Sequence, residues 1–340
     1  MNITFMIGNG FDINVGLNTR YSDFYPYYKR KCGNDIISKD LTENEEKWAD
    51  LELRLGAMLG SLDQKDIDIY LDAKENMEAL LSQYLIGENK RFRITSVDEF
   101  KKEFKTKIPS FYELLSEKEK NHYYSVVKDT INYCFIDFNY TDVLDRMIET
   151  VKKDDEPFSH HVFGNRGYND VIMPPLHIHG QLASDLVLGL NDESQITNEE
   201  LAKDDNLRQY IIKKTVNERL GEMKTEQAKG LIDGSRYVCL FGLSIGDTDK
   251  MWWQYLIEWL KRDTTFRLVL FVRDSSINQA SGQGKLRAMD KHVKRFISQS
   301  GNSPQQLGNV VNQILVVGNS DIFTFKSVQS VELLPTGRLF

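Results

Sequence analysis

The sequence predicts an α/β fold with a mostly parallel sheet of about six strands. Short apolar runs of strand length recur along the chain, and most are continuous rather than alternating, as in strands buried on both faces. Most connections between the runs are long enough to hold a helix. These two features predict a doubly wound, Rossmann-like sheet in a single domain that spans residues 1–340. The predicted strands are Ile3–Ile7, Tyr133–Phe138, Leu186–Leu190, Tyr237–Phe241, Phe266–Val272 and Gln313–Val317.

The stretch between the first two predicted strands is unusually long and has a helical pattern. Apolar residues fall at helical spacing from Trp48 to Met58 and again from Tyr70 to Tyr84. We expect a large helical insertion over residues 33–128 that packs as a cap on the sheet. A second helical stretch, Asn198–Gly230, separates the third and fourth predicted strands, and its alternating charges indicate a solvent-exposed face.

The composition is that of an ordinary globular protein, with 41% apolar and 27% charged residues. The net charge of -7 makes the chain a poor non-specific binder of nucleic acid or of an anionic membrane. Its three cysteines are too widely spaced for a disulfide framework or a C-x-x-C zinc site, and Cys134 and Cys239 lie in apolar runs that indicate core positions. No apolar stretch is long enough to span a membrane and no signal peptide is evident, so we expect a cytoplasmic protein without membrane contact.

Four polar segments hold the candidate site residues, and all of them can meet at one edge of the sheet, where ligands bind in open α/β folds. The first, Gly8–Asp12, has glycines that allow a sharp turn and exposed N–H groups that can hold a phosphate. A tight strand-to-helix turn explains it equally well. The second contains Asn139, whose amide can donate and accept hydrogen bonds without titrating.

The other two segments are a histidine pair and a glycine-rich turn. His177 and His179 stand two residues apart before Gly180, so an extended backbone would put both imidazoles on one face. Such a pair suits a base or a metal ligand, although a single histidine is usually structural. The segment Gly242–Asp249 follows a predicted strand, and a glycine-rich turn with an acidic helix cap is its simpler interpretation.

Taken in order, the segments Gly-Asn-Gly-Phe-Asp, Phe-Asn-Tyr-Thr, His-Ile-His-Gly and Gly-Leu-Ser-Ile-Gly-Asp resemble the AbiH family of bacterial abortive-infection proteins, and Trp48–Glu52 strengthens the resemblance. That family is more remotely similar to sirtuin-like NAD-binding domains. The resemblance implies an anti-phage effector that binds NAD and hydrolyses its nicotinamide–ribose bond, with Asn139 and His179 as catalytic residues and no metal. The implied cofactor-binding residues are Gly8, Asn9, Gly10, Phe11, Asp12, Tyr140, Thr141, His177, Gly242, Ser244 and Asp247.

This chemistry suits the residues. Cleavage of the bond develops an oxocarbenium-like ribose, which must be oriented and shielded from solvent. Asn139 could hold the water or a ribose hydroxyl, and His179 could accept a proton. Backbone donors, rather than a basic patch, would carry the charge of the cofactor. The four-cysteine zinc module of deacetylating sirtuins is missing from the sequence, which argues against peptide deacetylation.

Two other functions stay open. Asp12, Asn139, His177 and His179 are ligand types that a metal-dependent phosphoesterase or nuclease could use. A non-catalytic nucleotide-sensing module could use the same fold. Under the NAD hydrolase hypothesis the activity must be restrained in the host cell, and the helical insertion is the expected place for that restraint. A homo-oligomer and a phage-derived or co-encoded trigger are partners that the sequence neither identifies nor excludes.

Overall fold

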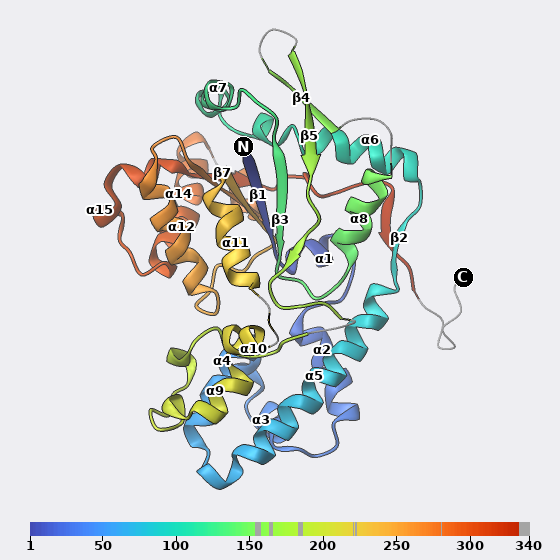
Figure 1. The fold of residues 1–340 in the computed structure, drawn as a ribbon, viewed down its shortest axis with the longest axis vertical. Coiled ribbons are helices and arrows are strands. Elements are labelled where there is room, and N and C mark those ends of the chain that lie inside the picture. Colours follow the sequence, from blue (N-terminus) through green and yellow to red (C-terminus); the bar gives the residue numbers. More distant parts are fainter. Residues whose placement is uncertain are drawn as a thin grey trace.

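The computed structural model describes residues 1–153, 158–162, 166–182, 186–219, 221, 223–279 and 281–332. Its centre is an eight-stranded sheet in the order β4-β5-β3-β1-β7-β8-β9, with β6 paired to β3 (Figure 1). Among the described strands of this sheet, β4–β5 is the one antiparallel pair. The mixed α/β class with a mostly parallel sheet is therefore confirmed. The strands are β1 (Asn2–Ile7), β3 (Asn132–Asp137), β4 (Phe158–Val162), β5 (Arg166–Ile172), β6 (Leu176–His177), β7 (Ser235–Phe241), β8 (Arg267–Val272) and β9 (Ile314–Gly318).

Helices cover both faces of this sheet, which explains why its strands are continuous apolar runs. In the central strand β1, Phe5 and Ile7 pack on one face against α6, α7 and α8, whereas Met6 packs on the other face against α11, α12 and α14. Cys134 and Cys239 are buried in β3 and β7, as predicted. These helices are α6 (Val97–Lys107), α7 (Glu117–Val126), α8 (Val143–Lys152), α11 (Lys224–Asp233), α12 (Lys250–Arg262) and α14 (Gly282–Gln299).

The five long parallel strands lie in the spatial order β3-β1-β7-β8-β9. Along the chain these are the second, first, third, fourth and fifth of the set, so the direction of winding reverses between β1 and β7. In open parallel sheets, the crevice beyond the carboxyl ends of the strands at such a reversal is where ligands bind. The turns after β1 and β7 lie at this point.

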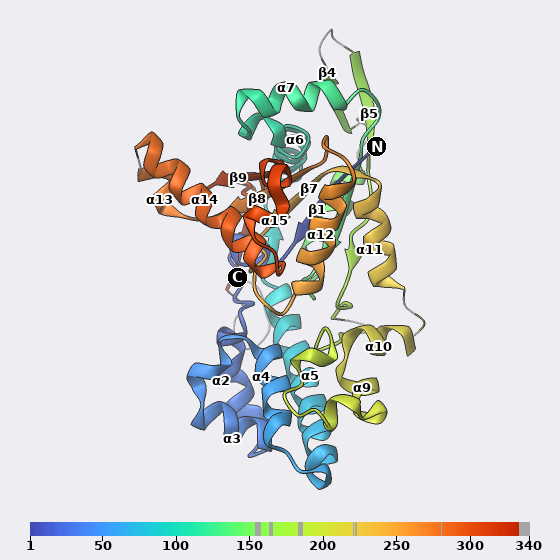
Figure 2. The same ribbon diagram turned by 90° about the vertical axis from the view of Figure 1, so that its left-hand side faces the viewer.

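A second group of helices forms a lobe beyond the carboxyl ends of these strands (Figures 1 and 2). We call it the helical lobe. Its core contains Trp48, Leu55, Tyr70 and Met77 together with Leu207 from a distant part of the chain. The lobe consists of α2 (Tyr21–Lys31), α3 (Ile36–Glu43), α4 (Leu51–Met58), α5 (Ile67–Asn89), α9 (Asp205–Ile211) and α10 (Lys213–Arg219).

The residues predicted as one insertion, 33–128, divide between two places in the fold. Helices α3, α4 and α5 lie in the helical lobe, whereas α6 and α7 pack on the sheet. Between them, β2 (Phe92–Ile94) pairs with β10 (Val328–Ser330) near the other end of the chain. The stretch 198–230 also divides, because α9 and α10 complete the lobe and α11 covers the sheet. Its charges are not all solvated, since Lys213 and Lys224 are buried.

The count of about six strands and the strand at Leu186–Leu190 were wrong. Strand β6 and the hairpin β4–β5 add to the sheet, whereas Leu186–Leu190 forms only one isolated bridge, from Leu190 to Ile212. The run is apolar because Leu188 and Leu190 pack into the helical lobe. Burial against helices and burial in a sheet leave the same apolar pattern over five residues.

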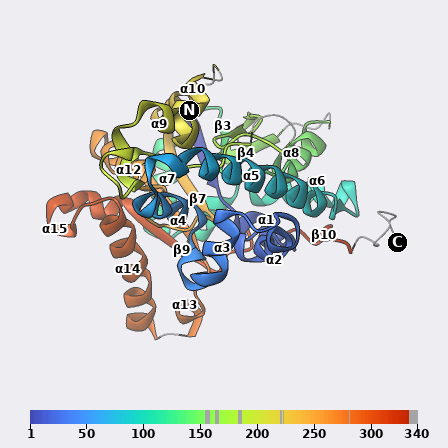
Figure 3. The same ribbon diagram turned by 90° about the horizontal axis from the view of Figure 1, so that it is seen from below.

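The last third of the chain adds an arm to the sheet. Helices α13 (Ser275–Gln279) and α14 follow β8 and project away from the other helices, as Figures 2 and 3 show from two directions. Only the carboxyl end of α14, at Phe296 and Ile297, is fully buried. The remaining α-helices among the described residues are α1 (Gly10–Asn14) after β1 and α15 (Pro304–Leu307) before β9.

Candidate active site

A cavity of about 700 Å³ lies where the turns after β1 and β7 meet the helical lobe. Its size is within the range of small-molecule binding pockets. Of the residues predicted for the site, seven line it, and these are Gly8, Asn9, Gly10, Tyr140, His179, Gly242 and Ser244. The other six, Phe11, Asp12, Asn139, Thr141, His177 and Asp247, do not.

The glycines of the first turn pack against the turn after β7. A Cβ atom on Gly10 would lie 2.6 Å from the Cα of Gly242, and one on Gly8 would lie 2.8 Å from the carbonyl oxygen of Gly242. The N–H of Gly10 donates to that same carbonyl at 2.8 Å, and the N–H of Phe11 donates to Gly8 at 2.9 Å. These N–H groups are already used, so the turn offers fewer donors to a phosphate than its sequence predicts. The Phe11 ring packs in the core against Phe323.

A buried polar network lies beside the cavity and holds the two turns. The amide Nδ2 of Asn139 donates to the carbonyl of Gly8 at 3.3 Å. The hydroxyl of Thr141 donates to Oδ2 of Asp12 at 2.8 Å, and the other oxygen of Asp12 has no partner among the described residues. Burial raises the pKa of Asp12 to about 7. Asp12 is therefore protonated in part of the molecules at neutral pH.

His177 belongs to this network rather than to the cavity. Its Nδ1 lies 3.1 Å from the carbonyl of Asn139, and its Nε2 lies 2.8 Å from a carboxylate oxygen of Asp145 on α8. Burial by itself lowers the pKa of His177, but the bond to Asp145 and the nearby Asp137 outweigh it and raise the pKa to about 9. Burial also raises the pKa of Asp137, to about 8. The imidazolium of His177 thus ties β6 to α8.

His179 lies in different surroundings from His177. Strand β6 ends at His177 and Gly180 has a positive φ of 80°, so the backbone turns here and the extended arrangement that would align the two rings is not formed. His179 is 7% exposed, and its ring meets Phe138 edge-on, with 5.5 Å between centroids. Its Nδ1 has no partner in the described part of the chain. Burial, helped by the charges of Lys213 and Lys224, holds the pKa of His179 well below its usual range, so the ring is neutral.

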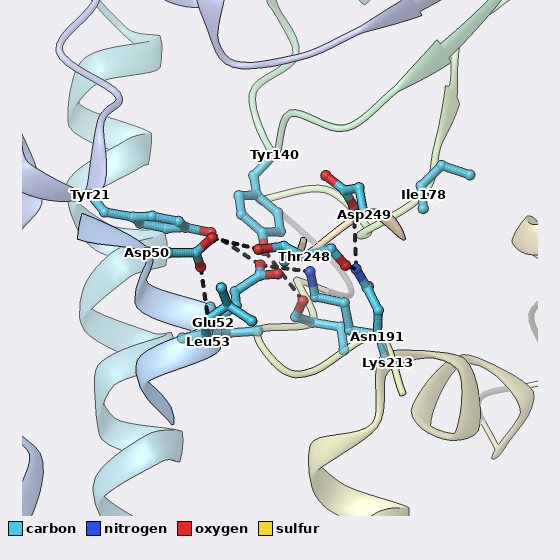
Figure 4. Close-up of polar contacts among 12 residues, drawn as sticks. Tyr21, Asp50, Glu52, Leu53, Tyr140, Ile178, Asn191, Lys213, Thr248 and Asp249 are labelled. Carbon is cyan, nitrogen blue, oxygen red and sulfur yellow. Dashed lines mark hydrogen bonds and ion pairs between the residues drawn. The ribbon is translucent and has the colours of Figure 1, made fainter. Parts of the chain in front are cut away.

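Three carboxylates line the side of the cavity that faces the helical lobe, and we call them the acidic wall: Asp50, Glu52 and Asp249 (Figure 4). Glu52 forms a buried ion pair with Lys213 at 2.6 Å and accepts a hydrogen bond from the Tyr21 hydroxyl at 3.2 Å. These contacts link α2, α4 and α10 at the cavity.

The other two carboxylates of the acidic wall have uncharged partners. Asp50 caps α4 through the N–H of Leu53 and accepts a hydrogen bond from the Thr248 hydroxyl at 2.5 Å. Asp249 accepts one from the amide of Asn191 at 3.2 Å. Burial raises the pKa of Asp249 to about 6. Both carboxylates connect the helical lobe with the turn that follows β7.

Sequence reasoning did not select these acidic residues. Asp50 and Glu52 lie in the Trp48–Glu52 segment, which the sequence analysis uses only as support for the family resemblance. The glycine-rich turn predicts a helix cap at Asp247 or Asp249, and Asp249 is the N-cap residue of α12, but its side chain makes no capping hydrogen bond. The sequence around Glu52 does not indicate its buried partner Lys213, because 161 positions separate the two residues.

Basic side chains line the cavity on the side of β8 and α14, and we call them the basic wall: Arg273, His292 and Arg295. The Nε of Arg295 donates to the carbonyl of Ile245 at 3.2 Å, and Nε2 of His292 lies 2.9 Å from Asp274. The cavity therefore has a basic patch, contrary to the expectation that backbone groups alone would meet an anionic ligand.

No group of three or more His, Cys, Asp or Glu side chains is arranged to hold a metal ion within the described ranges. In the same part of the chain, no helix combines the length and apolar character needed to cross a membrane.

Comparison with known proteins identifies the family. No curated protein matches the chain. The family model described as "Bacteriophage abortive infection AbiH" matches residues 4–271. The match runs from β1 to β8 and includes the helical lobe and the acidic wall, whereas the basic wall lies beyond it. Since the match covers most of the 340 residues, the chain belongs to the bacteriophage abortive infection AbiH family, and this membership implies a role in abortive infection by phage.

Proposed function

We propose that the protein is an abortive-infection effector that binds NAD in this cavity and hydrolyses its nicotinamide–ribose bond. One observation carries the proposal. Glycine turns, a buried neutral histidine and walls of opposite charge surround one cavity of about 700 Å³, at the point where the winding of the sheet reverses. A ligand of this kind combines an anionic diphosphate with sugar and base rings. The proposal treats the crevice as that of a Rossmann-like nucleotide-binding fold.

The diphosphate would lie against the basic wall. Arginine guanidinium groups bind phosphate oxygens through paired N–H donors, and Arg295 uses only its Nε in the contact with Ile245. The N–H groups of Gly10 and Phe11 are already bonded, so the arginines are the better anion donors. From β3 to β8 there are three strand spacings, roughly 14 Å in all, which suits an extended ligand.

His179 would orient the ribose. A neutral imidazole with a depressed pKa accepts a hydrogen bond from a hydroxyl or a water more readily than it takes up a proton. The nicotinamide that leaves is neutral, so cleavage needs no strong general acid. Asn139 has a different part in this proposal from the one that the sequence indicated. Its amide holds the carbonyl of Gly8, which makes it a positioning residue for the first turn.

The test is release of nicotinamide from NAD by the purified full chain. His179→Ala should lower the rate by about 100-fold or more, as expected when a group that orients or exchanges protons with the substrate is lost. His122→Ala is the matched control, since His122 is half-buried and lies 2.9 Å from the Tyr237 hydroxyl, outside the cavity. Its rate should stay within a few-fold of the wild type.

Three outcomes would contradict the proposal. Dinucleotide binding without nicotinamide release would favour a sensing module. Metal-dependent release of phosphate or cleavage of nucleic acid would favour the phosphoesterase. Full activity in His179→Ala would remove the proposed role of this residue.

A further inference from the structure

The cavity is electrically polarised. The acidic wall faces the helical lobe, whereas Arg273, His292 and Arg295 stand on the side of β8 and α14. Within the acidic wall, Glu52 is neutralised by Lys213 at 2.6 Å. Asp50 and Asp249 bond only to neutral hydroxyl and amide groups in the described structure. Lys213 also acts electrostatically on Asp249, and Arg20, which lines the cavity as well, pairs with Asp23 at 3.7 Å. One lysine thus serves three carboxylates, so the acidic wall keeps a net negative charge.

His179 provides a second observation, independent of the acidic residues. The imidazole of His179 lines the cavity, is more than nine-tenths buried, and has an Nδ1 without a partner among the described residues. A buried polar atom of this kind is rare unless a ligand or water satisfies it. Aromatic rings adjoin it, because Phe138 and Tyr140 both line the cavity and both contact the His179 ring.

Carboxylates and aromatic faces together are the surroundings that organic cations prefer. The basic wall, in contrast, suits an anionic diphosphate. From this arrangement we infer that the cavity selects a dipolar ligand, a dinucleotide whose base ring is a cationic pyridinium, with the ring against Asp50 and Asp249 and the diphosphate against the basic wall. This inference rests on the proposed function, and it specifies the oxidised form of the cofactor rather than the reduced form.

The chemistry of the two redox forms makes the inference testable. NAD⁺ and NADH carry the same diphosphate and sugars, and they differ in the nicotinamide ring, which is a cation in NAD⁺ and neutral in NADH. A preference between them therefore reports the charge felt by the ring. One favourable charge interaction at a partly hydrated site changes a dissociation constant by about ten-fold.

The experiment is calorimetric titration of the full chain at pH 8 and low salt, where Asp249 is ionised. The ligands are ADP-ribose, NADH and the carbocyclic analogue of NAD⁺, which keeps the cationic ring but is not hydrolysed. We expect the analogue to bind about ten-fold more tightly than NADH. Asp249→Asn and Asp50→Asn should each reduce this ratio and leave ADP-ribose affinity unchanged. Asparagine also caps helices well, so Asp50→Asn should keep α4 intact.

Asp247→Asn is the matched control, because Asp247 lies two residues from Asp249, is exposed and does not line the cavity. It should keep the full ratio. Equal affinities for the analogue and NADH, or an unchanged ratio in both wall variants, would overturn the inference and leave the proposed binding of dinucleotides in place. Failure of the wild type to bind ADP-ribose would instead overturn the proposed function.

Discussion

Removing the lysine of the buried pair Lys213–Glu52 should destabilise the junction between the helical lobe and the cavity. The two side chains are 4% and 7% exposed and their charged atoms are 2.6 Å apart. A Lys213→Met variant would leave the Glu52 carboxylate buried without a counter-charge, which costs about 3–5 kcal/mol in comparable cases. The Tyr21 hydroxyl still donates to Glu52, so we expect a value near the lower end of that range.

Urea unfolding measures this loss, and a double variant tests its cause. If the penalty is the unpaired charge of Glu52, Lys213→Met combined with Glu52→Gln should recover most of the lost free energy, because the Glu52 charge is then gone and the amide oxygen still accepts from Tyr21. A loss below about 1 kcal/mol in the single variant, or no recovery in the double variant, would refute the reasoning.

A second buried ion pair, between the sheet and α7, provides the control. Arg267 on β8 and Glu119 on α7 are also 2.6 Å apart and similarly buried, with 10% and 7% exposure. Arg267→Met should cost at least as much stability, because Arg267 also donates to two backbone carbonyls. It should leave dinucleotide affinity unchanged, whereas Lys213→Met should alter it, since of these four residues Glu52 is the one that lines the cavity.

Two further predictions concern the turns and the buried network. Gly242 has a φ of +71°, and a Cβ there would lie 2.6 Å from the backbone nitrogen of Phe11, so Gly242→Ala should cost at least about 1–2 kcal/mol in urea unfolding. An unchanged midpoint would contradict this packing. Asp12 keeps its proton up to about pH 7 in the folded state and loses it near pH 3.8 when unfolded, so its contribution to stability is lost as the pH rises from about 4 to about 7. Asp12→Asn should remove this pH-dependent loss of stability, which is up to about 4 kcal/mol at 1.36 kcal/mol per pH unit. A variant whose free energy of unfolding changes with pH in parallel with the wild type would count against the prediction.

The fold class could be predicted because five of the long strands are buried on both faces and carry continuous apolar runs. The short strands could not. Strand β6 has two residues, Leu176 and His177, and pairs only with the end of β3. The hairpin β4–β5 contains Ser159, Asn169 and Asp170, which interrupt any apolar pattern. The strand prediction at Leu186–Leu190 was wrong for the opposite reason. This run has a strand-like apolar pattern, but it is buried against helices.

The candidate site was only partly accessible from the sequence. The turns after the predicted strands Ile3–Ile7 and Tyr237–Phe241 contain Gly8, Gly10 and Gly242, which line the cavity, whereas His179 follows β6, a strand that the sequence does not predict. What a turn does with its N–H groups depends on its neighbour, and the bond from Gly10 to Gly242 joins residues more than 230 positions apart. Ion pairs between distant segments of the helical lobe, such as Lys213–Glu52, likewise cannot be predicted from the sequence alone.

The central place of β1 in the sheet also determines when the protein acquires its cavity during synthesis. β1 leaves the ribosome before the other strands of this sheet, and its partners β3 and β7 end only at residues 137 and 241, so one edge of β1 stays unpaired until β3 is made and the other until β7 is made. Glu52 likewise lacks its ion-pair partner until Lys213 has been made. The basic wall is complete only when Arg295 has been made. A nascent chain that stops short of α14 therefore lacks a complete cavity. The order of synthesis therefore delays the site until α14 has been made.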